Sequence, residues 1–141
     1  MENRKAVVTG GAGFIGSYLV KELLNNGWSV LVLDNFSTGT MDNLEPHPNL
    51  IIEATDIISS KLPTYKFDTL FHLAAPVSVP ESLEQPMKYW NGICVASRRV
   101  MSWAYEMGAT SMVAASTAAV YGDSELMPLK ESDTPNPMSP Y

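Results

Sequence analysis

A glycine-rich segment between a short apolar run and an amphipathic pattern constrains this chain more than any other feature. The run Lys5–Thr9 (KAVVT) has the length and composition of a buried parallel strand. Gly10, Gly13 and Gly16 follow it at intervals of three residues. Apolar side chains then recur at helical spacing over residues 15–26. A strand, a glycine turn and a helix in this order predict the start of a βαβ unit.

The rest of the chain continues this alternation. Apolar runs predict buried strands over residues 28–34, 50–56, 67–75 and 111–116, and a helical pattern covers residues 86–107. After Gly122 the density of Pro, Ser, Asp and Glu rises, which indicates loop. We therefore predict an α/β fold, a doubly wound parallel sheet (Rossmann fold) that ends after about five strands, as one domain over residues 1–141.

The composition limits the classes of partner. The 141 residues are 45% hydrophobic, which suffices for one domain with a core. The net charge is −6 and only nine residues are Lys or Arg, so we expect no nucleic-acid-binding surface. The doublets Arg4-Lys5 and Arg98-Arg99 are interpreted as solvated charges. No apolar run is long enough to span a membrane, and we expect no metal site.

The cysteine content bears on the cellular compartment. Cys94 is the single cysteine, which excludes a disulfide within the chain. It lies in a mixed apolar stretch, so we interpret it as a small core residue. The N-terminal sequence MENRKAVVTGG lacks the long apolar core of a secretory signal. These features predict a reducing, cytoplasmic setting.

The glycines and a later carboxylate predict a dinucleotide site. Gly10 lets the chain turn off the strand, Gly13 lets a pyrophosphate approach the main chain, and Gly16 lets the helix pack on the sheet. The free N–H groups at the helix start favour phosphate. Asp34 ends the next predicted strand, where its carboxylate binds ribose hydroxyls and repels a 2′-phosphate. We expect NAD rather than NADP; the alternative is a tight turn that binds nothing.

Six motifs match one known family. They are TGGAGFIG, DNFSTG, ATDI, HLAA, STAAVYG and the closing SPY. On these motifs the sequence resembles, from Lys5 to Tyr141, the extended short-chain dehydrogenase/reductase family of nucleotide-sugar epimerases and dehydratases. The resemblance implies NAD as the cofactor and a nucleotide sugar, specifically a UDP-sugar, as the substrate. It also implies a homodimer that involves the helix at residues 86–107.

The resemblance further implies which residues surround the cofactor. The pyrophosphate would be held by Gly10, Gly13, Phe14, Ile15 and Gly16. The adenosine ribose would be surrounded by Asp34, Asn35, Ser37, Thr38 and Gly39. The adenine would contact Asp56 and Ile57, and the nicotinamide side would be lined by Leu73, Ala74 and Ala75. His72 is interpreted as a strand-end residue without a catalytic role.

Catalysis in this family depends on a Ser or Thr hydroxyl and on a Tyr and a Lys in the motif Tyr-x-x-x-Lys. The resemblance assigns Thr117, with Ser116 beside it, to the hydroxyl position and Tyr141 to the tyrosine. The tyrosinate would take a proton from a sugar hydroxyl as hydride leaves to NAD. Tyr121 is the rival tyrosine, but Glu125 stands where its lysine would be. The sequence ends on Tyr141, so we expect a chain cut short before the lysine and inactive alone.

Two departures from the family pattern bear on the reaction. Ala118 and Ala119 stand where dehydratases and decarboxylases of the family carry an acidic residue. The resemblance therefore implies a 4-epimerase, which needs only reversible hydride transfer at one sugar carbon. Ile93 stands where the family usually has an asparagine, and Asn91 lies two residues earlier.

Three hypotheses stay open at this point. The chain is the NAD-binding part of a nucleotide-sugar 4-epimerase, a stand-alone dinucleotide-binding or dimerising module without turnover, or a doubly wound domain that binds no ligand. The first two both predict NAD binding. Because further strands would be missing, we also expect an exposed sheet edge and a chain that pairs with itself or is marginally stable.

Overall fold

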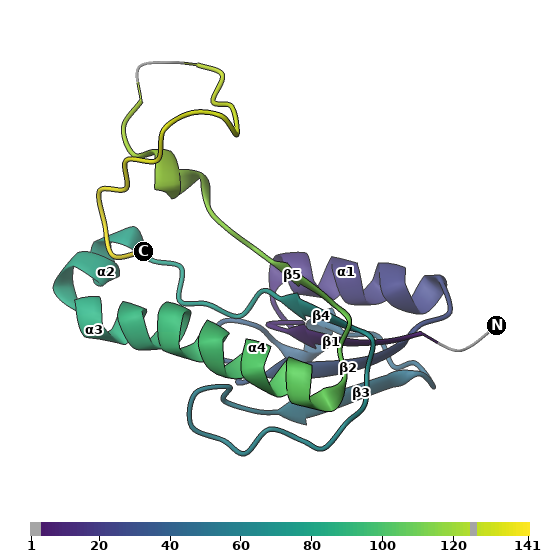
Figure 1. Ribbon diagram of the computed structural model, residues 1–141. Helices are drawn as coiled ribbons and strands as arrows, with labels where there is room; N and C mark the ends of the chain where they lie inside the picture. The colour runs from purple at the N-terminus through teal and green to yellow at the C-terminus, as the bar shows by residue number, and fades with distance from the viewer. Residues whose placement is uncertain (1–3, 125–126) are drawn as a thin grey trace.

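The structure is a computed structural model that describes residues 4–124 and 127–141 (Figure 1). Its strands are β1 (Lys5–Thr9), β2 (Ser29–Asp34), β3 (Leu50–Ala54), β4 (Thr69–His72) and β5 (Ser111–Ala114). Its α-helices are α1 (Phe14–Asn25), α2 (Val79–Glu84), α3 (Pro86–Tyr89) and α4 (Ala96–Met107). A π-helical segment, η2 (Trp90–Val95), joins α3 to α4, and η1 (Met41–Asn43) and η3 (Ala118–Tyr121) are 3-10 turns. All five predicted strands are confirmed, the first with its predicted bounds and the others shorter.

The five strands form one parallel sheet in the order β3-β2-β1-β4-β5. In the centre, Val7 lies opposite Leu31 of β2 on one side and Leu70 of β4 on the other. The chain first adds strands on one side of β1 and then on the other, so its connections diverge between β1 and β4. This divergence, at the carboxyl ends of the strands, is where doubly wound sheets bind ligands. The predicted fold class is confirmed.

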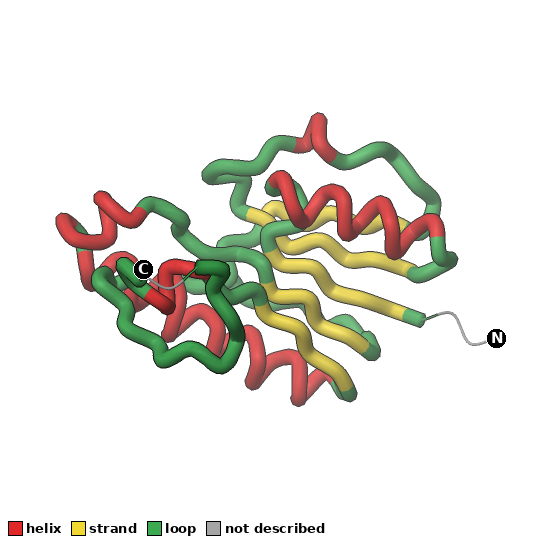
Figure 2. The backbone as a smooth tube through the Cα atoms, turned by 90° about the horizontal axis from the view of Figure 1, so that it is seen from above, coloured by secondary structure: helices red, strands yellow, loops and turns green. Residues whose placement is uncertain are grey.

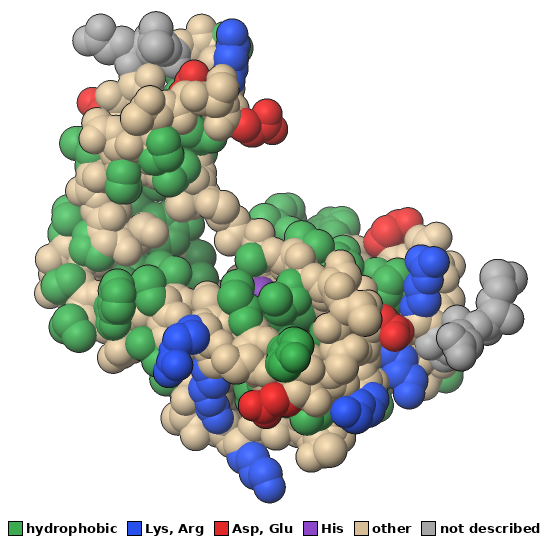
Figure 3. All heavy atoms as spheres, viewed as in Figure 1, with side chains coloured by type: hydrophobic (Ala, Val, Ile, Leu, Met, Phe, Trp, Pro, Cys, Tyr) green, Lys and Arg blue, Asp and Glu red, His purple; other side chains and the backbone are tan. Residues whose placement is uncertain are grey.

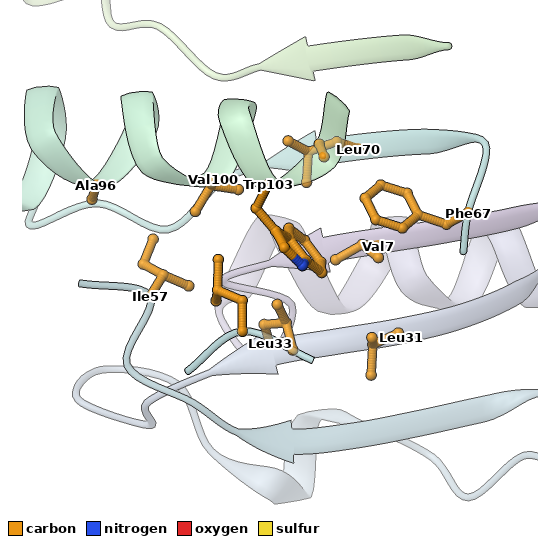
Figure 4. Packing of buried hydrophobic residues seen from close by; sticks show 11 residues of the cluster. Val7, Leu31, Leu33, Ile57, Phe67, Leu70, Ala96, Val100 and Trp103 are labelled. Atoms are coloured by element: carbon orange, nitrogen blue, oxygen red, sulfur yellow. The ribbon is translucent and has the colours of Figure 1, made fainter. Parts of the chain in front are cut away.

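Successive residues of β1 and β2 face two cores, one on each side of the sheet. Seen from above, α1 covers one face and α4 the other (Figure 2). Toward α4 point Val7, Leu31 and Leu33, which pack with Val100 and Trp103 (Figure 4). Toward α1 point Ala6, Val8, Val30 and Val32. Because both faces are buried, these strands are continuous apolar runs rather than alternating ones.

The segment predicted as one long helix over residues 86–107 is helical throughout, so that prediction is confirmed. Its middle turn, η2 between α3 and α4, is π-helical, which the sequence did not predict. Its Gly92 is buried against the loop after β4, and a Cβ at this position would lie 2.9 Å from the Cδ and Cγ atoms of Pro76. The wider π turn and the missing side chain together let the helix approach that loop. Gly108, with φ of 92°, ends α4.

The outer side of η2 carries the single cysteine. Cys94 is exposed there, so the interpretation as a core residue is wrong. The buried positions of this segment are instead Tyr89, Gly92 and Ala96. The helical spacing of four residues between Gly92 and Ala96 turns Cys94 outward.

The strand β5 forms one edge of the sheet. All four of its residues are exposed, with Met112 and Val113 at 50% and 51%. The exposed sheet edge expected from the sequence is therefore confirmed. Beyond β5 the chain leaves the sheet, and η3 with the described residues after it forms a C-terminal segment above α2 and α3 (Figure 1). The surface is hollowed between this segment and the sheet (Figure 3). Within residues 4–124 and 127–141, no helix combines the length and apolar character that a membrane span requires.

Candidate cofactor-binding site

The loops after β1 and β4 touch at the point where the chain connections diverge. The Leu73 N–H donates to the Thr9 carbonyl oxygen at 3.1 Å. Gly10 has φ of 72°, and a Cβ there would lie 2.8 Å from the Ala74 nitrogen, so both its conformation and this contact require glycine. Leu73 and Ala74 are partly buried, whereas Ala75 is exposed. The glycine loop and the predicted nicotinamide-side residues are thus brought together.

The N-terminus of α1 lies at the same side of the sheet, where the strands have their carboxyl ends, and it has no side-chain cap. Gly13 is its N-cap residue, and a Cβ on Gly13 would meet only the Gly10 carbonyl oxygen, at 3.3 Å. A Cβ on Gly16, in contrast, would collide with the same oxygen and with the main chain of the loop. Phe14 and Ile15 lie in the first turn with exposed side chains. Open approach at Gly13 and close packing at Gly16 are the arrangement that a pyrophosphate site requires.

Asp34 ends β2 with its carboxylate directed at the glycine loop. The side chain is only 7% exposed. Its Oδ2 accepts a hydrogen bond from the Ala12 N–H at 2.9 Å, and its Oδ1 accepts one from the Phe36 N–H at 2.8 Å. Each carboxylate oxygen can accept a further hydrogen bond. The structure therefore offers acceptors for a ribose diol and negative charge against a 2′-phosphate.

The residues that follow Asp34 divide into accessible and packed positions. Asn35, Ser37 and Thr38 are exposed, and the Asn35 Oδ1 accepts from the Ser37 N–H at 3.1 Å. These three residues remain available to a ligand beside Asp34. Gly39 is instead packed against the glycine loop, where a Cβ would lie 2.7 Å from the Ala12 carbonyl carbon.

Asn43 was missed by the sequence interpretation. Its Nδ2 donates to the Ala12 carbonyl oxygen at 2.8 Å, and the Thr40 N–H approaches the same oxygen at 3.3 Å. Thr40 caps η1 through a hydrogen bond of 3.4 Å from the Asp42 N–H to its Oγ1. The Thr-x-Asp pattern could have predicted this turn, but no signal in the sequence identified Ala12 as its partner.

Asp56 and Ile57 begin a turn directly after β3. The Asp56 Oδ1 accepts from the Ile58 N–H at 2.8 Å and its Oδ2 from the Ser59 hydroxyl at 2.9 Å. The hydrogen bond from Ile58 is the main cause that lowers the pKa of the Asp56 carboxyl, and Ser59 and Arg99 act in the same direction. The Ile57 side chain is buried in the core beneath α4. Of this pair, only Asp56 presents a partly accessible side chain.

Arg99 of α4 contacts the same turn. Its Nη1 donates to the carbonyl oxygens of Ile57 and Ile58, each at 2.7 Å, and its Nη2 donates to that of Ser60 at 2.6 Å. The interpretation of Arg99 as a solvated charge is therefore wrong, whereas Arg98 is exposed as expected. Its partners are main-chain atoms distant in sequence, so no residue pattern signals the contact.

His72 connects three elements beneath the site. Its Nδ1 lies 2.7 Å from the Thr9 Oγ1 at the end of β1, and its Nε2 lies 2.9 Å from the Ser97 Oγ of α4. Burial lowers the pKa of His72, which favours the neutral imidazole. The side chain is enclosed by these partners, in agreement with a strand-end role.

Thr117 and Tyr141, the two residues predicted to be catalytic, both lie beyond β5. Thr117 is the N-cap residue of η3, and its Oγ1 accepts from the Ala119 N–H at 3.1 Å. The Tyr141 ring lies edge-on to the ring of Tyr89, with centroids 6.3 Å apart. In the part of the chain that the structure describes, no hydrogen bond joins Thr117 to Tyr141. Each of the two residues is engaged by a different partner, Thr117 by the Ala119 N–H and Tyr141 by the Tyr89 ring.

The rival tyrosine lies in the same segment. Tyr121 is the last residue of η3 and is partly buried. Glu125, on which the preference for Tyr141 rests, lies outside the described residues. Among residues 4–124 and 127–141, no three His, Cys, Asp or Glu side chains form a group that could hold a metal ion.

A doubly wound parallel sheet whose glycine loop meets a buried carboxylate defines the chain as a dinucleotide-binding Rossmann domain. Residues 6–141 match the family described as the NAD dependent epimerase/dehydratase family. The chain belongs to this family.

Individual relatives are 4-epimerases. The chain is 34% identical over 138 residues to the UDP-glucose 4-epimerase of Corynebacterium glutamicum, a match that covers 97% of this chain and 42% of that enzyme. The structure of the UDP-N-acetylglucosamine 4-epimerase from Methanobrevibacter ruminantium in complex with UDP-N-acetylmuramic acid is similar with a TM-score of 0.90 at 37% identity, covering 100% of this chain and 46% of that one. The UDP-glucose 4-epimerase from Brucella ovis in complex with NAD gives 0.86 at 28% identity, covering 98% and 43%. The chain thus spans less than half the length of these relatives.

Proposed function

We propose that this chain is the NAD-binding part of a nucleotide-sugar 4-epimerase, which transfers hydride reversibly at one sugar carbon. The observation that carries the proposal is the position of Asp34, buried at the end of β2 with its carboxylate bound to the Ala12 N–H of the glycine loop. A carboxylate in this place suits the ribose of NAD and opposes the 2′-phosphate of NADP. The 4-epimerase names of the relatives, one of them solved with NAD, support the proposal.

The residues at the carboxyl ends of the strands fit the successive parts of NAD. Gly13 and the uncapped start of α1 would receive the pyrophosphate, and Asp34 the adenosine ribose. Asp56 would contact the adenine from the turn after β3, and Ala74 would face the nicotinamide side from the loop after β4. Bound NAD supplies the hydride acceptor for oxidation of a sugar hydroxyl.

Proton transfer is assigned to the C-terminal segment. Tyr141 would take the proton of the sugar hydroxyl, and Thr117 would hold that hydroxyl by a hydrogen bond. In this chain the Thr117 hydroxyl oxygen caps η3 and the Tyr141 ring packs on Tyr89. Both side chains thus have partners within the chain, and we propose that it binds NAD without turnover by itself. A stand-alone, non-catalytic binding module is the alternative.

The substrate proposed for the complete enzyme is a UDP-sugar. The names of the relatives support this class. Ala118 and Ala119 directly after Thr117 support epimerisation, because they supply no carboxylate for the additional proton transfers of dehydration.

A second copy of the chain is proposed as a partner. Apolar side chains are exposed along α2, α3 and η2, including Val79, Leu83, Met87 and Trp90. A patch of this kind on neighbouring helices is typical of an association surface. Sedimentation of the chain should show a dimer that dissociates when Leu83 and Met87 are both changed to Glu, and a monomer at all concentrations would contradict this proposal.

Titration calorimetry of the purified chain with NAD and with NADP tests the proposed function. We expect NAD to bind and NADP to bind at least about tenfold more weakly. In the Asp34→Ala variant the preference for NAD should be lost, because the repulsion of the 2′-phosphate is removed. If neither dinucleotide binds to the unsubstituted chain, the proposal is wrong.

A further inference from the structure

We infer that Arg99 is a positioning residue for the adenine end of the cofactor site, because its guanidinium fixes the turn that presents Asp56. The inference rests on the proposed function, in which Asp56 contacts adenine. Arg99 itself touches no proposed ligand atom. It acts on the main chain of the turn at residues 57–60.

The donors of the turn are bound by the residue directly before it, Asp56. Asp56 accepts the N–H of Ile58 and the hydroxyl of Ser59 with its carboxylate, and its carbonyl oxygen accepts the Ser60 N–H at 2.9 Å. These bonds satisfy donors at the start of the turn. A single turn also ends in carbonyl groups that have no partner within it. Those of Ile57, Ile58 and Ser60 need donors from elsewhere.

Arg99 supplies those donors from α4. Three hydrogen bonds of 2.6 to 2.7 Å run from its two terminal nitrogens to three carbonyl oxygens of one turn. The rigid plane of a guanidinium matches such a set, whereas the single ammonium of a lysine cannot reach the three oxygens with the same geometry. The cation also stabilises the nearby Asp56 carboxylate.

The helix that carries Arg99 is fixed to the sheet. Ala96, Val100 and Trp103 of α4 lie in the core, and the Ile57 side chain packs beside Ala96 and Val100 (Figure 4). On the strand side, the Thr55 N–H donates to the Asp34 carbonyl oxygen at 2.8 Å. The turn is therefore held between α4 and the end of β2, which places Asp56 near Asp34.

A second contact from the same helix provides a matched control. The Trp103 Nε1 donates to the Pro63 carbonyl oxygen at 2.9 Å, in the same connection between β3 and β4 but beyond the turn. Loss of this bond should lower stability without releasing Asp56. Arg98, the exposed neighbour of Arg99, controls for the loss of charge.

The experiment measures the NAD affinity of the chain by calorimetry, well below the thermal midpoint of each variant. We expect Arg99→Ala to weaken NAD binding by about tenfold or more and Arg99→Lys to restore part of the affinity. Arg98→Ala and Trp103→Phe should stay within about twofold of the unsubstituted chain, although Trp103→Phe should lower the thermal midpoint. Amide hydrogen exchange should accelerate at Ile58 and Ser60 in both Arg99 variants.

Each remaining outcome separates the inference from the function on which it rests. If the unsubstituted chain does not bind NAD, the proposed function and this inference both fail. If Arg99→Ala binds NAD as the unsubstituted chain does, the inference alone is overturned. It is equally overturned if Trp103→Phe weakens NAD binding as much as Arg99→Ala does, because Arg99 would then contribute only stability. If Arg99→Ala does not fold, Arg99→Lys decides by the same criteria.

Discussion

The carboxylate of Asp34 accepts a 2.9 Å hydrogen bond from the main-chain N–H of Ala12, which lies 22 residues earlier in the chain. Ala12 is fully buried, and its carbonyl oxygen accepts the side-chain amide of Asn43. The N–H and the carbonyl oxygen of Ala12 are thus bound by the last residue of β2 and by the segment that follows it, respectively. The glycine loop and the segment from Asp34 to Asn43 are therefore a single structural unit, although the sequence presents them as two motifs.

The first prediction concerns this connection. Asp34→Asn replaces one carboxylate oxygen by an NH2 group, which cannot accept from the Ala12 or the Phe36 N–H. A buried N–H left without an acceptor should reduce the free energy of unfolding by about 1–3 kcal/mol. Urea unfolding measures the loss, and Asp42→Asn in the exposed turn η1 is the matched control. Equal stability of the two variants would contradict the role of Asp34.

The second prediction separates two glycines of the loop. Gly16→Ala places a Cβ against the Gly10 carbonyl oxygen and the adjoining main chain, so it should destabilise the fold by about 1–3 kcal/mol or more. Gly13→Ala meets only one atom, at 3.3 Å, and should nearly preserve the thermal midpoint. It should still weaken NAD binding, because the new methyl group would lie where the proposed function places the pyrophosphate. A lower thermal midpoint for Gly13→Ala than for Gly16→Ala would contradict the close packing of Gly16 against the glycine loop.

The fold could be predicted from the sequence because its strongest signals are local. The sequence predicts Lys5–Thr9 as a buried strand, and the structure buries its residues Ala6–Thr9 between α1 and α4. Gly10, Gly16 and Asp34 each occupy positions that follow from their place at a strand end or a helix start. Such features depend on spacing within a few residues, which the sequence displays directly.

The features that the sequence did not reveal depend on contacts across the fold. Arg99 resembles Arg98 in the sequence, yet only Arg99 meets carbonyl groups of the turn after β3. Cys94 lies in an apolar stretch but is turned outward, because Gly92 and Ala96 on either side of it are the positions that pack into the fold. The mutual placement of Thr117 and Tyr141 depends on a long loop-rich segment with few periodic signals.

The third prediction concerns pH and His72. Burial lowers the pKa of His72 below its usual value of 6.5, so the unfolded chain takes up the proton first as the pH falls. Stability is therefore fully present above about pH 6.5 and should decrease toward pH 5, by at most about 1.4 kcal/mol per pH unit. The lowered pKa values of Asp56 and Glu81 act at lower pH.

Urea unfolding at pH 5.0 and 7.5 measures this effect. The His72→Gln variant should lose most of the difference in unfolding free energy between the two pH values, because it removes the buried titrating group. His47→Gln, at an exposed position, should retain that difference. If the pH dependence persists in His72→Gln and disappears in His47→Gln, it arises from His47 and the prediction is wrong.

The fourth prediction concerns the residue on which Tyr141 packs. Tyr89 is fully buried, and its hydroxyl accepts from the Ser78 N–H at 2.8 Å and donates to the Glu81 Oε2 at 3.0 Å. Tyr89→Phe keeps the ring but leaves the Ser78 N–H without its acceptor, which should cost about 1–3 kcal/mol in urea unfolding. Tyr105→Phe, at an exposed position of α4, should cost almost nothing.

NMR of the Tyr141 ring tests the contact itself. Because the edge-on ring contact is retained in Tyr89→Phe, the chemical shifts of the Tyr141 ring protons should change little in that variant. They should change strongly in Tyr89→Leu, which removes the ring. Unchanged Tyr141 signals in Tyr89→Leu would show that Tyr89 does not hold the tyrosine.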